Sequence, residues 1–457
     1  MADWAEHRGA SGEPRPMAKF TGAPVARLLV ALSLVLTASE AEEPPPTGKA
    51  ADNGKAAPEK LEPAKAEDAR MTLPSAELPP FQLTPVTANF WGRYTRAIEL
   101  PVEAPKGLQV GHTTLYPSFS ETLTYDDNLF GLSSAKIRDF ILRTEPGFGI
   151  NHRFSENVAL TTGYAFSWND YLDDNARDYL THSANFNLNV ANMAVEGLSL
   201  SIYDSYGQTA NTGILNENFL SYQRQHQNTV GTVLSFSRGP ITTSGSYSFS
   251  FVDLFGVDNA DYSYHTVQGL FAYKVDSHFS PFLRYSFQSY DFALDQSNYT
   301  DHTIAGGLRY RPLEQFMFEL ALGNHRAVAV ATGDSTDGPL AGLRLVYVHN
   351  ERISAYFTAS REYEVGVRTG GGTTISLEAG TQARVLKDLW LGSRASWTRE
   401  VRQGGSDLRT TQAGVVVRYN FRRQFVFTGD YSFTCRESNY GHYVSYNKAV
   451  LGFSWRF

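Results

Sequence analysis

The side chains best suited to chemistry in this sequence are arginines that recur at regular places after residue 280. They stand at polar positions of segments in which polar and apolar residues alternate, and such alternation puts every second side chain on the same face of a strand. Guanidinium groups bind carboxylate and phosphate through paired hydrogen bonds. The pattern predicts one polar surface that carries six of them: Arg284, Arg309, Arg344, Arg384, Arg394 and Arg418.

The elements that must position these arginines are strands. Alternating segments fill the chain from Thr114 to Phe457, and in one of them Tyr247, Phe249 and Phe251 alternate with serines. A period of two is the pattern of a strand with two different faces. Counting such segments gives about 18 strands, with 16 as the lower bound. The part of the chain from 114 to 457 is therefore predicted to be all-β.

The connections between these segments predict how the strands are arranged. Short connections such as 238–240 and 386–388 alternate with long ones rich in Asp, Asn and Gly, such as 126–136 and 362–372. Large aromatic residues also gather near the strand ends, as they do at a water–lipid interface. A soluble two-sheet protein would alternate in the same way but would not show this pairing of turns with loops. We expect an antiparallel up-and-down transmembrane β-barrel.

A barrel of this size leaves an aqueous channel unless it is plugged, so function is expected in its interior. The inward charges predicted beside the six arginines are four cations, Arg143, Lys274, Lys448 and Arg456, and five acids, Glu145, Glu319, Glu378, Glu400 and Asp430. Two interpretations stay open. A net cationic interior would favour anionic solutes. Alternatively, the arginines pair with the acids and simply fill the interior.

The chain ends in residues that could be recognised during assembly. Phe453 and Trp455 share a face with Phe457, the final residue. Together with Gly452, they resemble the C-terminal signal bound by the barrel-assembly machinery, in which a Gly precedes alternating apolar residues and an aromatic end. The sequence departs from that signal at Val450, where a polar residue is usual.

The first 113 residues differ in composition from the rest, since 14 of the 20 prolines precede residue 114. Residues 1–41 are predicted to be an over-extended start followed by a secretory signal peptide, with Met17 as the true start and an apolar region at 28–36. Residues 42–113 are expected to be a periplasmic linker or a plug, and their Pro/Ala-rich part is expected to be disordered.

Composition excludes several classes of function. A net charge of −7 is not the basic charge expected of a nucleic-acid-binding protein. A single cysteine allows neither a disulfide framework nor a cysteine zinc site. The histidines are scattered without a nucleophile motif beside them, so no enzyme and no cofactor are predicted. The acids of the long loops match no twelve-residue calcium loop, and we expect them to be solvated or bridged to lipopolysaccharide.

The segment 117–130 resembles the opening strand of a family of outer-membrane barrels, β-barrel porin type 2. The resemblance rests on Pro117-Ser118 at the start, Glu121-Thr122 in the middle, and Tyr125 and Asp127-Asn128 at the first loop. The family is associated with exopolysaccharide production or export. The resemblance therefore implies a transport role and carries no catalytic residues.

Two functions follow from these observations. The first is a porin-like channel in the outer membrane of a Gram-negative-type bacterium, an exit port for an anionic polysaccharide or another anionic solute. The alternative is a non-conducting structural or docking barrel of a surface-polysaccharide or envelope assembly, in which 42–113 meets a periplasmic export component. Outer-membrane lipid, lipopolysaccharide and the barrel-assembly machinery are expected partners of either.

Overall fold

The computed structural model describes residues 107–457, apart from 130–135, 174–177, 217–218, 256–260, 293–297, 351, 367–369, 403–404, 406, 423 and 440–441. The predicted signal peptide and nearly all of the predicted linker lie outside the described residues. All regular structure in the described ranges is β-strand. A search of the same residues for an apolar helix long enough to cross a bilayer finds none.

The strands run in chain order and have these bounds: β1 (Leu108–Val110), β2 (Thr113–Asp126), β3 (Asp139–Arg153), β4 (Val158–Tyr171), β5 (Tyr179–Val190), β6 (Leu198–Asn216), β7 (Phe219–Arg238), β8 (Ile241–Phe255), β9 (Tyr262–Tyr273), β10 (Phe279–Phe292), β11 (Tyr299–Leu313), β12 (Phe316–Ala329), β13 (Ser335–Asn350), β14 (Ile353–Gly366), β15 (Gly370–Leu386), β16 (Leu389–Arg402), β17 (Asp407–Phe421), β18 (Phe425–Ser438) and β19 (Tyr443–Arg456).

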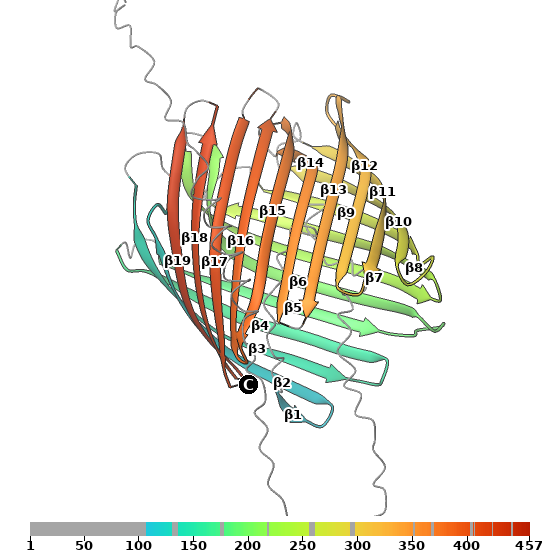
Figure 1. The fold of residues 1–457 in the computed structure, drawn as a ribbon, viewed down its shortest axis with the longest axis horizontal. Coiled ribbons are helices and arrows are strands. Elements are labelled where there is room, and N and C mark those ends of the chain that lie inside the picture. The colour runs from blue at the N-terminus through green and yellow to red at the C-terminus, as the bar shows by residue number, and fades with distance from the viewer. Residues whose placement is uncertain are drawn as a thin grey trace, which may run out of the picture. The chain divides into compact units, whose positions relative to one another are not determined.

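Strands β2 to β19 form a closed antiparallel barrel. Each pairs with its neighbour in sequence, and β19 pairs with β2 through nine residue pairs from Lys448↔Asp126 to Arg456↔Ser118. In Figure 1, β14–β17 cross in front of β4–β6, as tilted strands on opposite walls of a barrel do. The predicted 18-strand up-and-down barrel is confirmed within the described residues. The short β1, which pairs with β2, was not predicted.

The barrel has two different edges. We call the edge that holds the connections after β3, β5, β7, β9, β11, β13, β15 and β17 the turn end, and the opposite edge the loop end. The sequence analysis predicted this difference, with short connections at one end of the barrel and long ones at the other. The predicted long loop at 362–372 is wrong, because β14 and β15 continue their pairing as far as Gly366↔Gly370. The glycines that suggested a loop lie in a strand.

The pairing register assigns every strand residue to one of two faces, because directly paired residues point the same way. Ala305 and Ala321 are 1% and 0% exposed, whereas their neighbours Ile304 and Leu322 are 52% and 57% exposed. The first pair therefore lies on the inner face and the second on the outer face. Large apolar side chains on the outer face are exposed on many strands, as expected of a wall that meets lipid.

The inner face carries two buried apolar clusters on adjacent strands. One lies toward the turn end and consists of Leu270, Ala272, Phe282, Ala305, Ala321 and Leu340. The other lies toward the loop end and consists of Val252, Tyr264, Tyr290, Phe292 and Tyr299. In the second cluster the Tyr290 and Tyr299 rings stack with their centroids 4.5 Å apart. The wall from β8 to β13 is thus packed with side chains rather than bare.

A polar seam closes the barrel where the first strand meets the last. Asp127 accepts hydrogen bonds from the backbone N–H of Asn447 and from its side-chain Nδ2, each at 2.7 Å. The carboxylate of Asp126 accepts the backbone N–H of the buried Asn128 at 3.0 Å. These acids and Asn128 are therefore structural in this barrel: they hold the first loop and join β2 to β19.

Replacing Asp127 by Ala is expected to weaken this seam, because it removes two hydrogen bonds to a charged acceptor. Such bonds contribute about 1.5–3 kcal/mol each, so the free energy of unfolding should fall by roughly 2–4 kcal/mol, allowing for partial exposure of the site. Urea unfolding of the barrel folded in lipid vesicles measures this. Asp337→Ala is the matched control, since Asp337 lies 3.8 Å from Arg326 in a pair whose two side chains are both more than half exposed. Equal losses in the two variants would contradict the seam.

Candidate functional site

The pairing register places all six of the singled-out arginines on the inner face. Arg309 pairs with Glu319 and Glu319 with Arg344, in a row that runs across β11, β12 and β13. Arg284 pairs with the buried Ala305. On the far side of β14, a second row pairs Arg384 with Trp390 and Trp390 with Arg418. Arg394 is four residues along β16 from Trp390 and pairs with glycines of β15 and β17. The six arginines therefore form two groups, one on each side of β14.

The first group, on β10, β11 and β13, is largely packed into the wall. The Nε and Nη2 atoms of Arg309 donate to the same Glu319 oxygen at 3.0 and 2.8 Å, and the Glu319 side chain is only 4% exposed. Arg284 is 8% exposed, and its guanidinium lies 5.8 Å from the centre of the Phe282 ring. Arg309 matches the interpretation in which inward cations pair with inward acids, whereas Arg284 is buried beside an aromatic ring.

The second group, on β15, β16 and β17, is more open. The nearest acid to Arg394 is Asp430, at 3.9 Å between Nη2 and Oδ2, and the Arg394 side chain is 46% exposed. The guanidinium of Arg384 lies 5.7 Å from the centre of the Trp390 ring. The nearby Glu378 accepts a hydrogen bond from the Tyr356 hydroxyl at 2.6 Å. This group leaves cationic surface that a solute in the interior could reach.

Glycines beside Arg394 make room for the side chains of this group. Gly380 and Gly414 pair with Arg394 from its two sides. A Cβ on Gly380 would lie 2.3 Å from the Tyr356 ring, and one on Gly414 would lie 2.9 Å from the Tyr431 carbonyl oxygen. Because Gly380 has no side chain, the Tyr356 ring lies flat over it and its hydroxyl reaches Glu378.

Gly380→Ala is therefore expected to displace the Tyr356 ring and lower the free energy of unfolding by about 1–3 kcal/mol, the usual cost of overpacking. Gly269→Ala is the matched control, since it also lies within a strand and a Cβ there would meet nothing within 4 Å. Both variants are compared by urea unfolding in vesicles. The packing assignment is contradicted if the two lose the same stability.

The inner charges are unevenly distributed along the barrel axis. Each of the six arginines lies within the seven residues of its strand nearest the turn end. The sequence-based list of inward charges was incomplete. The register also places the cations Arg402 and Arg436 on the inner face, together with four further acids, Asp126, Asp139, Asp301 and Glu362. Those four lie within five residues of the loop end. The interior as a whole is less basic than predicted, but its turn-end half has the excess of cations.

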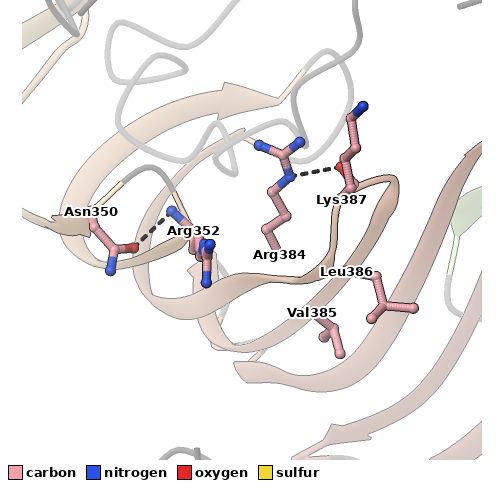
Figure 2. A pocket seen from close by; sticks show the side chains of 6 residues that line it. All are labelled: Asn350, Arg352, Arg384, Val385, Leu386 and Lys387. Carbon is pink, nitrogen blue, oxygen red and sulfur yellow. Dashed lines mark hydrogen bonds between the residues drawn. The ribbon is translucent and has the colours of Figure 1, made fainter. Parts of the chain in front are cut away.

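The cationic surface continues onto the turn end. A cavity of about 470 Å³ opens between the β13–β14 and β15–β16 connections, and its polar lining includes Arg352, Arg384 and Lys387. Figure 2 shows the Arg384 and Lys387 side chains on one side of it, with Arg384 Nε donating to the Lys387 carbonyl at 2.7 Å. The turn-end mouth therefore presents several cations at one place.

The turns at this edge are held by local hydrogen bonds. In the β9–β10 turn the backbone N–H groups of His278 and Phe279 donate to Asp276 at 2.6 and 2.8 Å. These bonds hold the pKa of the Asp276 carboxyl below its usual value. An Asn does the same in the β13–β14 turn, where the Arg352 N–H donates to Asn350 Oδ1 at 2.8 Å.

The C-terminal residues singled out for assembly also have structural partners. Phe453 lies on the outer face with its ring 5.3 Å from that of Phe427. A Cβ on Gly452 would lie 2.4 Å from Thr428 Oγ1, so the inner face needs a glycine there. The Trp455 and Phe457 rings meet edge to face at 6.2 Å, and the Phe457 N–H donates to the Pro117 carbonyl. Recognition of these residues by the assembly machinery remains a prediction.

Several histidines lie on the outer face, each beside a tyrosine. The hydroxyls of Tyr164, Tyr247 and Tyr285 lie 2.6, 2.8 and 3.0 Å from the Nδ1 atoms of His182, His265 and His302. No group of three or more His, Cys, Asp or Glu suited to a metal ion occurs in the part of the chain that the structure describes. The outer-face histidines thus pair with tyrosines rather than with each other.

No protein-family model and no curated protein sequence matches this chain. Among solved structures, it is similar to OccK2 (OpdF) of Pseudomonas aeruginosa in complex with glucuronate, at 12% identity over 76% of this chain and 98% of that one, with a TM-score of 0.48. It is also similar to OccK9 (OpdG), at 10% identity over 76% and 98%, with a TM-score of 0.48. The siderophore receptor PirA of the same organism gives 7% identity over 75% and 80%, with a TM-score of 0.43.

Proposed function

We propose that this chain is a porin-like channel of the outer membrane that passes anionic solutes. The observation that carries the proposal is the concentration of inward arginines in the turn-end half of the barrel. The most important are the β15–β17 arginines, Arg384, Arg394 and Arg418, of which Arg394 is exposed and the other two are partly buried. Fixed positive charge on a narrow wall raises the local concentration of anions and lowers that of cations.

The outer face supports a membrane location. Its strands present exposed apolar side chains all around a closed barrel. Closure leaves no sheet edge whose backbone N–H and C=O groups would lack hydrogen-bond partners in lipid. Barrels of this kind have short periplasmic turns and longer loops at the cell surface. On this basis the cationic turn end faces the periplasm, and an anion leaving the cell would meet the arginines first.

The chemistry of the β15–β17 arginines indicates the class of solute. Guanidinium groups bind carboxylate and phosphate, and Trp390 offers an apolar ring beside Arg384 and Arg418. An acidic polysaccharide has both carboxylates, which guanidinium groups bind, and sugar rings with apolar faces, which can stack on Trp390. The resemblance of segment 117–130 to barrels linked with exopolysaccharide export points to the same class.

The proposal is tested by planar-bilayer conductance of the refolded mature chain and of a chain that lacks residues 42–106. Steady openings of the mature chain are expected. Openings only after the deletion would identify 42–106 as a plug and keep the channel. Silence in both would contradict the proposal and favour the second candidate.

That second candidate is a non-conducting docking barrel, and the packed wall from β8 to β13 is the observation that favours it. There, Arg309 and Glu319 pair inside the wall, and two buried clusters cover the inner face. Under this alternative, the loops and the segment before residue 107 would meet envelope partners, and the interior would only support the fold.

A further inference from the structure

The outer face of β14–β19 changes character at one level. Between the turn end and this level, no described outward position of these strands carries a charged side chain. These positions carry residues such as Leu391, Val417 and Phe427 instead. The first charged residues above this level are Arg361 on β14, Arg399 on β16 and Arg409 on β17. The first outward charges of neighbouring strands therefore appear together.

The register shows that these charges form a single row. Arg361 pairs with Ile375, Ile375 with Arg399, Arg399 with Arg409, and Arg409 with Glu437. Neighbouring strands lie about 4.8 Å apart, so the three arginines lie within roughly 15 Å of one another along the wall. We call Arg361, Arg399 and Arg409 the outer arginine row.

The height of the row matches the edge of a bilayer. Arg361 lies eight residues above Ile353 at the turn end, and Arg409 lies twelve above Phe421. With a rise of about 3.3 Å per residue and a tilt of about 40°, these positions are roughly 20–30 Å above the turn end. The apolar band of such barrels is about 25 Å tall. The row therefore stands where lipid tails give way to headgroups at the loop end.

The positive charges in the row lie close together, and a bound anion would stabilise them. Arg399 and Arg409 are directly opposite each other, a pairing that is unfavourable for like charges. One carboxylate lies between them: Asp407 Oδ2 accepts Arg399 Nη2 at 2.7 Å and lies 3.5 Å from Arg409 Nη2. The Arg399 and Arg409 side chains remain 40% and 52% exposed. Arg361 is exposed and has no ion pair among the described residues.

We propose that the outer arginine row binds the phosphorylated headgroup of a lipid in the leaflet at the loop end. The acyl chains of that lipid would lie on the uncharged wall directly below, where Leu377 and Trp397 occupy the next outward positions. A lipid is the occupant because the row is continuous with the lipid-facing surface. Its three guanidiniums outnumber the adjoining carboxylates of Asp407 and Glu437 and suit a phosphomonoester. The inference rests on the proposed membrane location and does not require a conducting channel.

The test uses the full mature chain folded in phosphatidylcholine bilayers that contain a minor fraction of phosphatidic acid. Lipids that remain bound after transfer to mild detergent are counted by native mass spectrometry. The wild type is expected to retain phosphatidic acid more than about tenfold better than the Arg361→Gln, Arg399→Gln, Arg409→Gln variant, because each arginine near a surface contributes substantially to anionic lipid binding. Retention of phosphatidylcholine is expected to be equal.

The matched control removes the same charge from the turn end, as Arg153→Gln, Arg238→Gln, Arg422→Gln, and is expected to retain phosphatidic acid like the wild type. Equal retention by wild type and row variant would overturn the site. The lipid assignment would be overturned if inorganic phosphate raised the melting midpoint of the wild type, but not of the row variant, as much as phosphatidic acid does. A chain that fails to fold into bilayers would overturn the membrane location itself, which separates that failure from failure of the site.

Discussion

Replacement of Arg309 by Met is expected to lower the free energy of unfolding of the barrel by about 3 kcal/mol, the low end of the range for breaking a buried ion pair. The reason is that Glu319, with a side chain only 4% exposed, would lose both hydrogen bonds from Arg309. The low end applies because Arg344 remains directly opposite Glu319. Urea unfolding in vesicles, followed by tryptophan fluorescence, measures the change.

The double variant Arg309→Met, Glu319→Gln separates this cause from simple loss of packing. Removing the carboxylate together with its partner removes the uncompensated buried charge, so the double variant should recover most of the lost stability. If the double variant is as unstable as the single one, the ion pair is not what holds this part of the wall.

Neutralising the β15–β17 arginines, as Arg384→Gln, Arg394→Gln, Arg418→Gln, is expected to lower the preference of the channel for anions over cations roughly two- to eightfold. Each charge acts on an ion about 10 Å away with about 0.4 kcal/mol in water, and screening at 0.1 M salt cuts that to about a third. Permeability ratios from single-channel recordings measure the change. The effect should shrink as the salt concentration rises.

The outer arginine row supplies the control for this experiment. Arg361→Gln, Arg399→Gln, Arg409→Gln removes the same charge from the outer face, where the barrel wall separates it from the conducting path. That variant should keep the selectivity of the wild type. An equal loss of selectivity in both triple variants would mean that overall charge, rather than the lining, sets the preference.

The face of each arginine could be predicted from sequence because a strand has a period of two, and a local pattern is enough to separate the polar side from the apolar one. Contacts between strands could not be predicted in this way. Arg309 meets Glu319 only because β11 and β12 pair in one particular register, and Asp127 meets Asn447 only because the barrel closes. Neither contact leaves a signal in the alternation of a single segment.

The inward acids that the sequence analysis missed share a simple cause. Asp126, Asp139 and Asp301 are among the first or last three residues of their strands, where alternation merges into acid-rich loops. Glu362 was assigned to a loop because a run of glycines follows it, but those glycines pair in β15. A strand end cannot be told from a loop by composition when the partner strand sets where pairing stops. These inward acids were therefore visible only in the structure.

The most direct test of the central claim is the reversal potential of the wild-type barrel in a planar bilayer with a potassium chloride gradient across it. A channel lined by the β15–β17 arginines should give steady openings whose reversal potential has the sign of chloride preference. A reversal potential of cation-selective sign, or of zero, in steady open channels would contradict the claim that these arginines set what the barrel passes.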